Sequence, residues 1–150
     1  MVAVDTNLLV YAHREDATWH KEAGANLLEL ANGNERWAIP WPCVHEFLAI
    51  VTHPRIYKPP TPAKIACEAI RVWMGSPALV LIGESSGYFD RLEELAVAAR
   101  IVGGAIHDAR IAALCLYHGV TEFWSVDRDF SRFAGLKVRN PLVHPPETNR

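Results

Sequence analysis

The chain has 150 residues, of which half are hydrophobic and 21% are charged, and its formal net charge is −2. This length and composition suit one globular domain, 1–150, whose core needs no disulfide or structural metal. The charge balance excludes a basic nucleic-acid-binding surface spread over the whole protein, so any positive surface must be local. No uncharged apolar run is long enough for a membrane helix, and a predicted strand at the N-terminus leaves no room for a signal peptide. We therefore expect a soluble, cytoplasmic protein with no membrane partner.

Three cysteines, Cys43, Cys67 and Cys115, are far apart in the sequence. Their odd number argues against a disulfide framework, and no C-x-x-C spacing suggests a zinc site. Each lies in an apolar helical context, so we expect three buried, reduced thiols.

Short apolar runs alternate along the chain with longer segments of helical character. Strand signals occur at residues 2–5, about 37–39, 79–82, 122–126 and 137–139. Helices are expected at 8–12, 20–32, 41–53, from Thr61-Pro62 to Gly75, from Ser85 or Ser86 toward Gly103-Gly104, and over 106–118 up to Gly119. Thr61 is predicted to cap its helix, with Pro62 in the first turn. Residues 140–150 form a Pro-rich tail.

This alternation predicts βαβ units, and therefore an α/β fold with a parallel sheet covered on both faces. In open sheets of this kind, ligands bind beyond the carboxyl ends of the strands. Asp5 ends the first strand, Val2-Ala3-Val4, and Asp127 ends a late one, Phe123-Trp124-Ser125-Val126. The two aspartates are therefore expected to meet at one edge of the sheet.

Two further acids lie in otherwise apolar helical segments, Glu46 within 41–53 and Asp108 at the start of the late helix. Burying several carboxylates near one another is unfavourable unless a cation joins them. A hard divalent ion such as Mg²⁺ takes oxygen ligands and keeps water positions open for a phosphate substrate. Together with Asp5 and Asp127, these acids indicate metal-dependent phosphodiester chemistry.

Each of the four acids also has a purely structural explanation. Asp5 and Asp108 are possible helix N-caps, and Asp127 is a possible Asx-turn residue. Glu46 is compatible with a solvated edge position. The conjunction of four acids at one sheet edge favours the functional interpretation, because clustered carboxylates mark functional sites.

Neighbouring polar residues extend this set. Asn7 is a candidate for capping the first helix or for orienting a metal-bound water. Arg110 is the only basic side chain in its helix apart from histidines, and is a candidate phosphate contact or neutralising partner. Near Asp127, a second acid, Asp129, follows Arg128 within three residues, which an Asx-turn alone does not explain.

The resemblance to a known family is carried by Val4-Asp5-Thr6-Asn7, Glu46, Thr52-His53-Pro54-Arg55-Ile56, His107-Asp108-Ala109, Ser125-Val126-Asp127-Arg128-Asp129-Phe130 and Asn140-Pro141-Leu142. In this order they resemble the PIN-domain ribonucleases and, within them, the VapC-type toxins of bacterial toxin–antitoxin pairs. The likeness covers nearly the whole chain. Ser125 departs from the threonine that is frequent at this position in the family, but it keeps a hydroxyl.

The resemblance implies a PIN-like three-layer α/β/α fold with a central, mostly parallel five-stranded sheet. It implies endonucleolytic cleavage of RNA with Mg²⁺ as cofactor and Mn²⁺ as a substitute. It also implies a homodimer and neutralisation by a cognate VapB-type antitoxin, whose C-terminal segment binds an apolar groove beside the acidic site.

The resemblance further implies separate roles for the acids. Asp5 and Asp108 would coordinate the metal, with Asp127 as a direct or water-mediated ligand. Glu46 would hold a metal-bound water or accept its proton. The supporting residues would be Asn7, Ser125 and Asp129, and the RNA backbone would be contacted by Arg110 and Arg128.

Two other classes remain open from the sequence. A haloacid dehalogenase-type phosphatase also places an Asp after its first strand, but it needs a second Asp two positions later, where this chain has Asn7. A PIN-like scaffold that binds RNA or protein without cutting is the non-enzymatic alternative. P-loop and serine hydrolase chemistry have no supporting motif.

Overall fold

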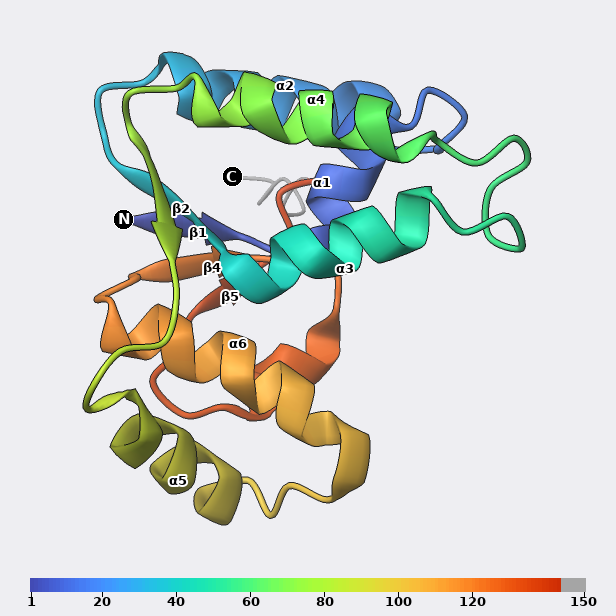
Figure 1. Ribbon diagram of the computed structural model, residues 1–150. Coiled ribbons are helices and arrows are strands. Elements are labelled where there is room, and N and C mark those ends of the chain that lie inside the picture. The colour runs from blue at the N-terminus through green and yellow to red at the C-terminus, as the bar shows by residue number, and fades with distance from the viewer. Residues whose placement is uncertain (144–150) are drawn as a thin grey trace, which may run out of the picture.

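The computed structural model describes residues 1–143, which include one sheet of five parallel strands (Figure 1). The strands are β1 (Val2–Val4), β2 (Trp37–Pro40), β3 (Leu79–Ile82), β4 (Glu122–Trp124) and β5 (Val138–Arg139). Their order across the sheet is β3-β2-β1-β4-β5, and every neighbouring pair is parallel. The α/β fold class and the five-stranded parallel sheet are confirmed.

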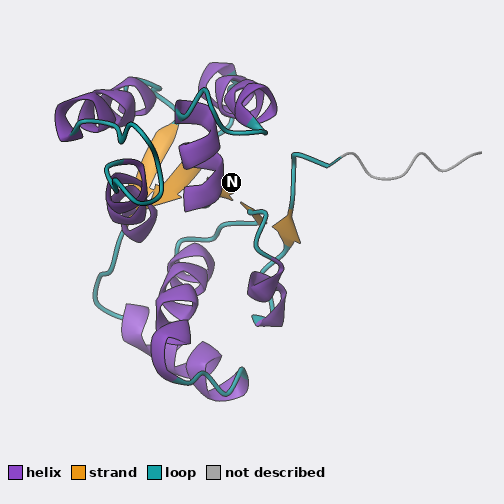
Figure 2. Ribbon diagram, turned by 90° about the vertical axis from the view of Figure 1, so that its right-hand side faces the viewer, coloured by secondary structure: helices purple, strands orange, loops and turns teal. Residues whose placement is uncertain are grey.

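Helices cover both faces of this sheet. In the described part of the chain they are α1 (Thr6–His13), α2 (His20–Asn32), α3 (Trp41–Val51), α4 (Ala63–Met74), α5 (Tyr88–Ala98) and α6 (Ile106–Tyr117), with 3₁₀ helices η1 (Gly103–Ala105) and η2 (Arg128–Arg132). The group α1, α2 and α4 lies on one side, with α3 against α1 and α4. Figure 2 shows the α5–α6 pair set apart from these helices. None of the helices among residues 1–143 is long and apolar enough to span a bilayer.

The central strand β1 is the point where the sheet reverses its direction of growth. The chain builds outward from β1 through β2 to β3, and later places β4 and β5 on the other side of β1. The strands of the sheet are apolar because both of its faces are covered, and all four residues of β2 are buried. Such a reversal opens a crevice beyond the carboxyl ends of the two strands beside it. The residues that follow β1 and β4 therefore face a common space.

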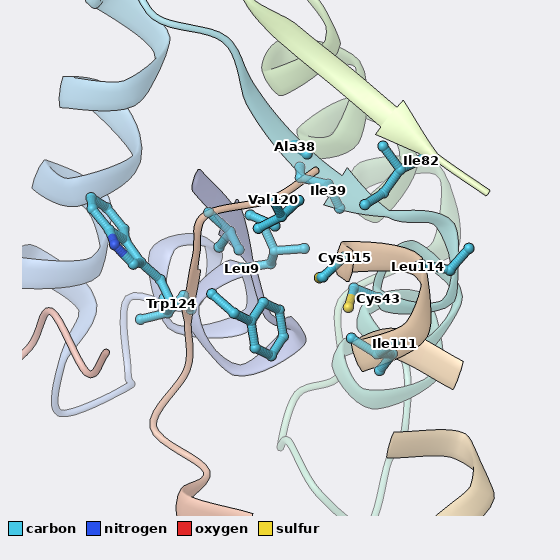
Figure 3. Packing of buried hydrophobic residues seen from close by; sticks show 14 of the residues in the cluster. Leu9, Ala38, Ile39, Cys43, Ile82, Ile111, Leu114, Cys115, Val120 and Trp124 are labelled. Atoms are coloured by element: carbon cyan, nitrogen blue, oxygen red, sulfur yellow. The ribbon is translucent and has the colours of Figure 1, made fainter. Parts of the chain in front are cut away.

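A hydrophobic core lies between the sheet and its helices (Figure 3). Cys43 of α3 and Cys115 of α6 are fully buried in it, and Figure 3 shows them beside Ile111. The expectation of a third buried thiol is wrong, because Cys67 is exposed. Its neighbour Ala66 is fully buried, and successive residues of a helix point in different directions, so Cys67 lies outside the core-facing stripe of α4. All three cysteines are free thiols.

The start of α4 differs from its prediction. The helix begins at Ala63, with Pro62 in the cap position and no side-chain capping bond. The Thr61 hydroxyl instead lies 3.1 Å from Arg14 Nη1 and 3.0 Å from His13 Nε2. The Thr61 hydroxyl therefore contacts the end of α1 instead of capping α4.

The helix predicted from Ser85 or Ser86 toward Gly103-Gly104 is shorter at both ends, since α5 runs over Tyr88–Ala98. Its C-terminus is closed at Arg100, whose φ of 52° lies in the left-handed region. Two backbone hydrogen bonds of 2.9 and 3.2 Å around this residue complete a Schellman motif. Glycine usually fills that position, and a prediction that runs on to the first glycine misses this end.

Of the two acids that are possible N-caps, one caps its helix. Asp5 caps α1, because its carboxylate accepts a hydrogen bond from Thr6 N at 2.7 Å. Asp108 is not a cap: α6 begins at Ile106, Ala105 holds the cap position, and Asp108 lies within the first turn. An acid in the first turn is still favourable there, because the helix dipole is positive at this end.

Three strands are shorter than their signals at 2–5, 122–126 and 137–139. Asp5 and Asp127 lie just beyond their strands and cap the helices that follow, α1 and η2, although Asp5 N still donates to Trp124 O of β4 at 2.9 Å. Of the Pro-rich tail predicted at 140–150, residues 144–150 lie outside the described residues.

Candidate active site

The four predicted acids line one pocket, to which four separate elements contribute. Asp5 follows β1, Glu46 lies in α3, Asp108 lies in α6 and Asp127 follows β4. This acid pocket has a volume of about 200 Å³, and its other lining residues are Thr6, Asn7, Ile50, Ile111 and Phe130. It lies at the reversal point beside β1, where a parallel sheet of this kind binds its ligand.

Asp5 forms the floor of the acid pocket and is only 5% exposed. Its Oδ1 accepts from Thr6 N at 2.7 Å, and its Oδ2 accepts from Ser125 Oγ at 2.6 Å. Burial raises the pKa of Asp5 to about 6, against the lowering effect of the hydrogen bonds from Ser125 and Thr6. The fold therefore keeps a carboxylate where ionisation is unfavourable unless a cation is nearby.

Glu46 reaches the pocket from α3 and is held by Thr6. The Thr6 hydroxyl donates to Glu46 Oε2 at 2.6 Å. Because Thr6 is the first residue of α1 and directly follows Asp5, one helix N-terminus positions both acids. Thr6 was not among the site residues predicted from the sequence, although its place between Asp5 and Asn7 was a usable signal.

Asp108 is paired with a basic side chain at the edge of the acid pocket. Its Oδ2 lies 3.2 Å from Arg132 Nη2, and both side chains are about one-third exposed. Burial and the charge of Asp127 raise the pKa of Asp108, and the Arg132 guanidinium opposes this. Within residues 1–143, Arg132 is the one base in an ion pair with an acid of the pocket. Arg132 was not predicted from the sequence, although it lies in η2, four residues after Arg128.

Ser125 connects Asp5 to Asp127. Its hydroxyl donates to Asp5 and accepts from Asp127 N at 2.9 Å. Asp127 Oδ1 in turn accepts from Asp129 N at 2.9 Å, which is the Asx-type cap considered above. Asp127 therefore has a structural bond and a place in the acid pocket at once, while the exposed Asp129 side chain is not part of the lining.

Asn7 provides the observation that tests whether a metal fits. Its Nδ2 lies 3.4 Å from Asp5 Oδ2 and 3.4 Å from Ser125 Oγ. Its Oδ1 is buried and has no hydrogen-bond partner within residues 1–143, a state that costs about 1–3 kcal/mol. With the carboxylates it makes a donor set of oxygens only, which suits a hard divalent cation such as Mg²⁺ or Mn²⁺. The residues of the acid pocket therefore fit such an ion.

The acids do not form a finished coordination sphere. Within residues 1–143, no three His, Cys, Asp or Glu side chains come close enough together to hold a metal ion. Carboxylates repel one another without a cation, and Arg132 and Thr6 hold two of them by hydrogen bonds. Coordination of one ion by three of these carboxylates at once therefore requires side-chain movement.

The two predicted RNA-contacting arginines lie outside the acid pocket. Arg110, in α6, forms an ion pair with Glu84. Arg128 is exposed and lines a neighbouring pocket that also includes Asp127. A larger pocket of about 360 Å³ at the end of α1, lined by residues 13–16, contains an Arg14–Asp16 ion pair of 2.7 Å and no comparable group of acids.

Comparison with known proteins identifies relatives along almost the whole chain. The family model for the PIN domain matches residues 2–136. Ribonuclease VapC43 of Mycobacterium tuberculosis is 34% identical over 142 residues, covering 95% of this chain and 96% of the relative. Ribonuclease VapC33 of the same organism is 31% identical over 146 residues, covering 95% and 99%.

Two solved structures share the fold at lower identity. VapBC2 from Rickettsia felis, bound to a DNA fragment from their promoter, matches with a TM-score of 0.69 and 20% identity, covering 93% of this chain and 98% of that chain. Mycobacterium tuberculosis VapC20, described as a Sarcin-Ricin loop cleaving toxin, matches with a TM-score of 0.64 and 18% identity, covering 91% and 99%. The resemblance found in the sequence is confirmed: this chain belongs to the PIN-domain family, among the VapC ribonucleases.

Proposed function

We propose that this protein is a metal-dependent endoribonuclease and the toxin of a VapBC-type toxin–antitoxin pair acting in the cytoplasm. The observation that carries the proposal is the acid pocket, which is lined by four acids from separate elements and by Asn7, whose oxygen has no hydrogen-bond partner among the described residues. The ribonuclease names of the relatives over more than nine-tenths of their length support it. A phosphatase of the haloacid dehalogenase type has no support from these matches.

Mg²⁺ is the proposed cofactor, with Mn²⁺ as a substitute. Asp5, Asp108 and Asp127 would hold the ion, and the Asn7 oxygen is the further donor that the pocket offers. When bound, such an ion lowers the pKa of a water nucleophile and offsets the charge of the phosphoryl oxygens.

The protein side chains would orient the reactants and move the proton. Glu46, fixed by the Thr6 hydroxyl, would accept the proton of the attacking water. Arg132, at the rim beside Asp108, would contact the phosphate when Asp108 turns to the ion. The RNA backbone on either side would be contacted by Arg110 and Arg128.

Cleavage of single-stranded RNA by the wild type, Asp5→Asn and Asp108→Asn tests the proposal. Both variants should lose about 100-fold or more of the Mg²⁺-dependent rate, since each removes one of the proposed ligands, while circular dichroism stays unchanged. Asp90→Asn, an exposed acid in the first turn of α5, is the matched control and should cleave normally. Full activity in both pocket variants would contradict the assignment.

A VapB-type antitoxin is the proposed protein partner. An apolar groove of about 210 Å³ lies between α1, α2 and α4, with Leu27, Leu28, Val72 and Trp73 in its lining. Leu28 and Val72 are 61% and 75% exposed. Adjoining exposed apolar side chains mark protein interaction sites, so this groove is the proposed binding site of the antitoxin segment. It shares no lining residue with the acid pocket, so the proposal differs from the groove beside the acidic site that the resemblance implies. A homodimer is the proposed oligomeric state, and light scattering at several concentrations measures it.

A catalytically silent PIN-like scaffold is the second candidate, because no preformed three-ligand group exists within residues 1–143. Titration calorimetry with Mg²⁺ and Mn²⁺ separates the two functions. A nuclease should bind the ion with heat release or uptake that disappears in Asp5→Asn. A scaffold should bind RNA without any metal signal and without an effect of chelator.

A further inference from the structure

A second pocket shares Asp127 with the acid pocket. It has a volume of about 270 Å³ and lies beside the end of β4, η2 and β5. Its lining includes Val126, Arg128, Ser131, Val138, Asn140 and Val143. We call it the flanking pocket. Ser125 and Asp127 of its lining already belong to the acid site, and Arg128 has a general backbone role in the proposed function.

The walls of the flanking pocket combine apolar and polar groups. Val126, Val138 and Val143 are apolar, whereas Ser131 and Asn140 bring a hydroxyl and an amide. Asn140 Oδ1 accepts from Leu142 N at 3.0 Å, which leaves Nδ2 as a donor with no partner among the described residues. Apolar and polar side chains together line small-ligand sites, and the volume of this pocket lies just below their usual range. The pocket therefore suits one small, flat group such as a nucleobase.

The segment that borders this pocket carries more basic than acidic side chains, although the whole protein has a negative net charge. Residues 128–139 carry four basic side chains and one acid, against 15 bases and 17 acids in the full chain. Lys137 and Arg139 pair with Glu122. Arg128 makes no ion pair within residues 1–143, so it is available for a phosphate. Local positive charge is what a polyanionic ligand requires of such a protein.

We propose that the flanking pocket binds the nucleotide next to the scissile phosphate of the RNA substrate. The base lies between the valines, Asn140 Nδ2 donates to an acceptor on the base, and Arg128 contacts the adjoining phosphate. Because Asp127 lines both pockets, a phosphate held in the acid pocket places the next nucleotide at the flanking pocket. The inference rests on the proposed function and adds to it a source of sequence preference.

Binding of single-stranded RNA to an inactive Asp5→Asn background tests occupation of the pocket. Ser131 is exposed, so Ser131→Phe fills the pocket without entering the core, and Ser131→Ala is the matched control that keeps the space. Ser131→Phe should weaken RNA affinity about 10-fold through loss of the base contact, and Ser131→Ala, which removes one hydroxyl and keeps the space, should weaken it by no more than about 3-fold. Equal affinities in the two variants would overturn the inference.

The salt dependence of the same binding tests Arg128. Arg128→Gln should reduce the slope of log affinity against log salt by about 0.7, the value for one phosphate contact on a single strand. Arg91→Gln, on α5 and outside both pockets, should not change it. An unchanged slope for Arg128→Gln would remove the phosphate contact from the proposal.

Cut-site sequencing of a randomised RNA separates this inference from the proposed nuclease function. Asn140→Ala should still cleave, but its base preference at one position beside the cut should fall about 3- to 10-fold with the lost hydrogen bond. An unchanged preference overturns the inference even when the wild type cleaves. RNA binding that depends on Ser131 without any wild-type cleavage overturns the nuclease function and leaves the pocket assignment standing. Loss of antitoxin binding alone would assign the pocket to a protein and overturn the inference.

Discussion

Asp5 has two opposite effects on the stability of the folded state. As the N-cap of α1 it contributes about 1 kcal/mol to the helix. As a buried acid with a pKa of about 6, it opposes folding whenever it is ionised without a cation. Ser125 and Thr6 lower this penalty by donating hydrogen bonds but do not remove it. A residue kept in this state is better explained by a ligand than by helix capping alone.

The stability of the metal-free protein should fall as pH rises from about 4 to 7. The folded pKa of Asp5, about 6, is above its ordinary value of 3.8, so its contribution is complete below pH 3.8 and is lost as pH rises through 6. Urea unfolding with chelator present measures this. Asp5→Asn should flatten this part of the pH profile. At pH 7 its free energy of unfolding should exceed that of the wild type by up to about 3 kcal/mol.

Added Mg²⁺ provides the counterpart to that experiment. Protons and the cation compete for the same carboxylate, so Mg²⁺ should stabilise the wild type more at pH 7 than at pH 5. In Asp5→Asn, the stabilisation by Mg²⁺ should differ less between pH 7 and pH 5. A wild-type profile that is flat with and without Mg²⁺ would rule out the raised pKa of Asp5.

At the scale of secondary structure, α5 and α6 end with the same backbone motif built from different residues. Arg100 follows α5 with a φ of 52°, and Gly119 follows α6 with a φ of 74°. Each motif has two closing hydrogen bonds, of 2.9 and 3.2 Å in both helices. The left-handed region strains a residue that has a Cβ, by about 1 kcal/mol, but not glycine. The end of α6 therefore gave a sequence signal and the end of α5 did not.

Arg100→Gly and Gly119→Ala should change stability in opposite directions. The first relieves strain and should stabilise the protein by up to about 1 kcal/mol, reduced by the added freedom of the unfolded chain. Gly119→Ala introduces strain at a positive φ and should destabilise the protein by about 1 kcal/mol. No atom lies within 4 Å of the added Cβ, so this backbone strain is the only expected cost. Thermal unfolding of both variants measures this, and a shift of the same sign in both would contradict the shared motif.

At the scale of the whole molecule, the sheet order brings distant segments into one site. The carboxyl ends of β1 and β4 are neighbours, although Asp5 and Ser125 are 120 residues apart in sequence. The alternation of strands and helices predicted this convergence, because parallel sheets share one carboxyl edge. The apolar groove between α1, α2 and α4, with its exposed Leu28 and Val72, shares no lining residue with the acid pocket. Catalysis and neutralisation can therefore be changed separately.

Leu28→Asp should separate toxicity from neutralisation. Wild-type protein expressed alone should arrest growth, and co-expression of the adjacent small open reading frame should relieve the arrest. Leu28→Asp places a charge in the apolar groove, so it should remain toxic and resist relief, with antitoxin affinity reduced about 10-fold or more. Leu28→Ala is the milder control. Relief equal to that of the wild type would move the antitoxin site away from this groove.

The sequence was sufficient to predict an element or a site residue where local signals agreed. It was insufficient where a contact with a distant residue determined the role of a side chain. The helix 20–32 and the strand 79–82 were predicted at their observed bounds, since their periodicity and flanking residues coincide. The acids of the pocket were found because acids are rare in apolar segments. Thr6 and Arg132 were missed because their roles depend on partners 40 and 24 residues away. Thr61 does not cap its helix because its hydroxyl bonds to Arg14, which is also distant in sequence.

A crystal grown or soaked with Mn²⁺ and measured at the manganese absorption edge tests the central claim most directly. The claim is that the acid pocket binds a divalent ion through Asp5, Asp108 and Asp127 once the side chains close around it. An anomalous peak among these three carboxylates, absent from Asp5→Asn crystals, is the predicted result. No peak in the pocket of an otherwise well-ordered, Mn²⁺-saturated crystal would contradict the account.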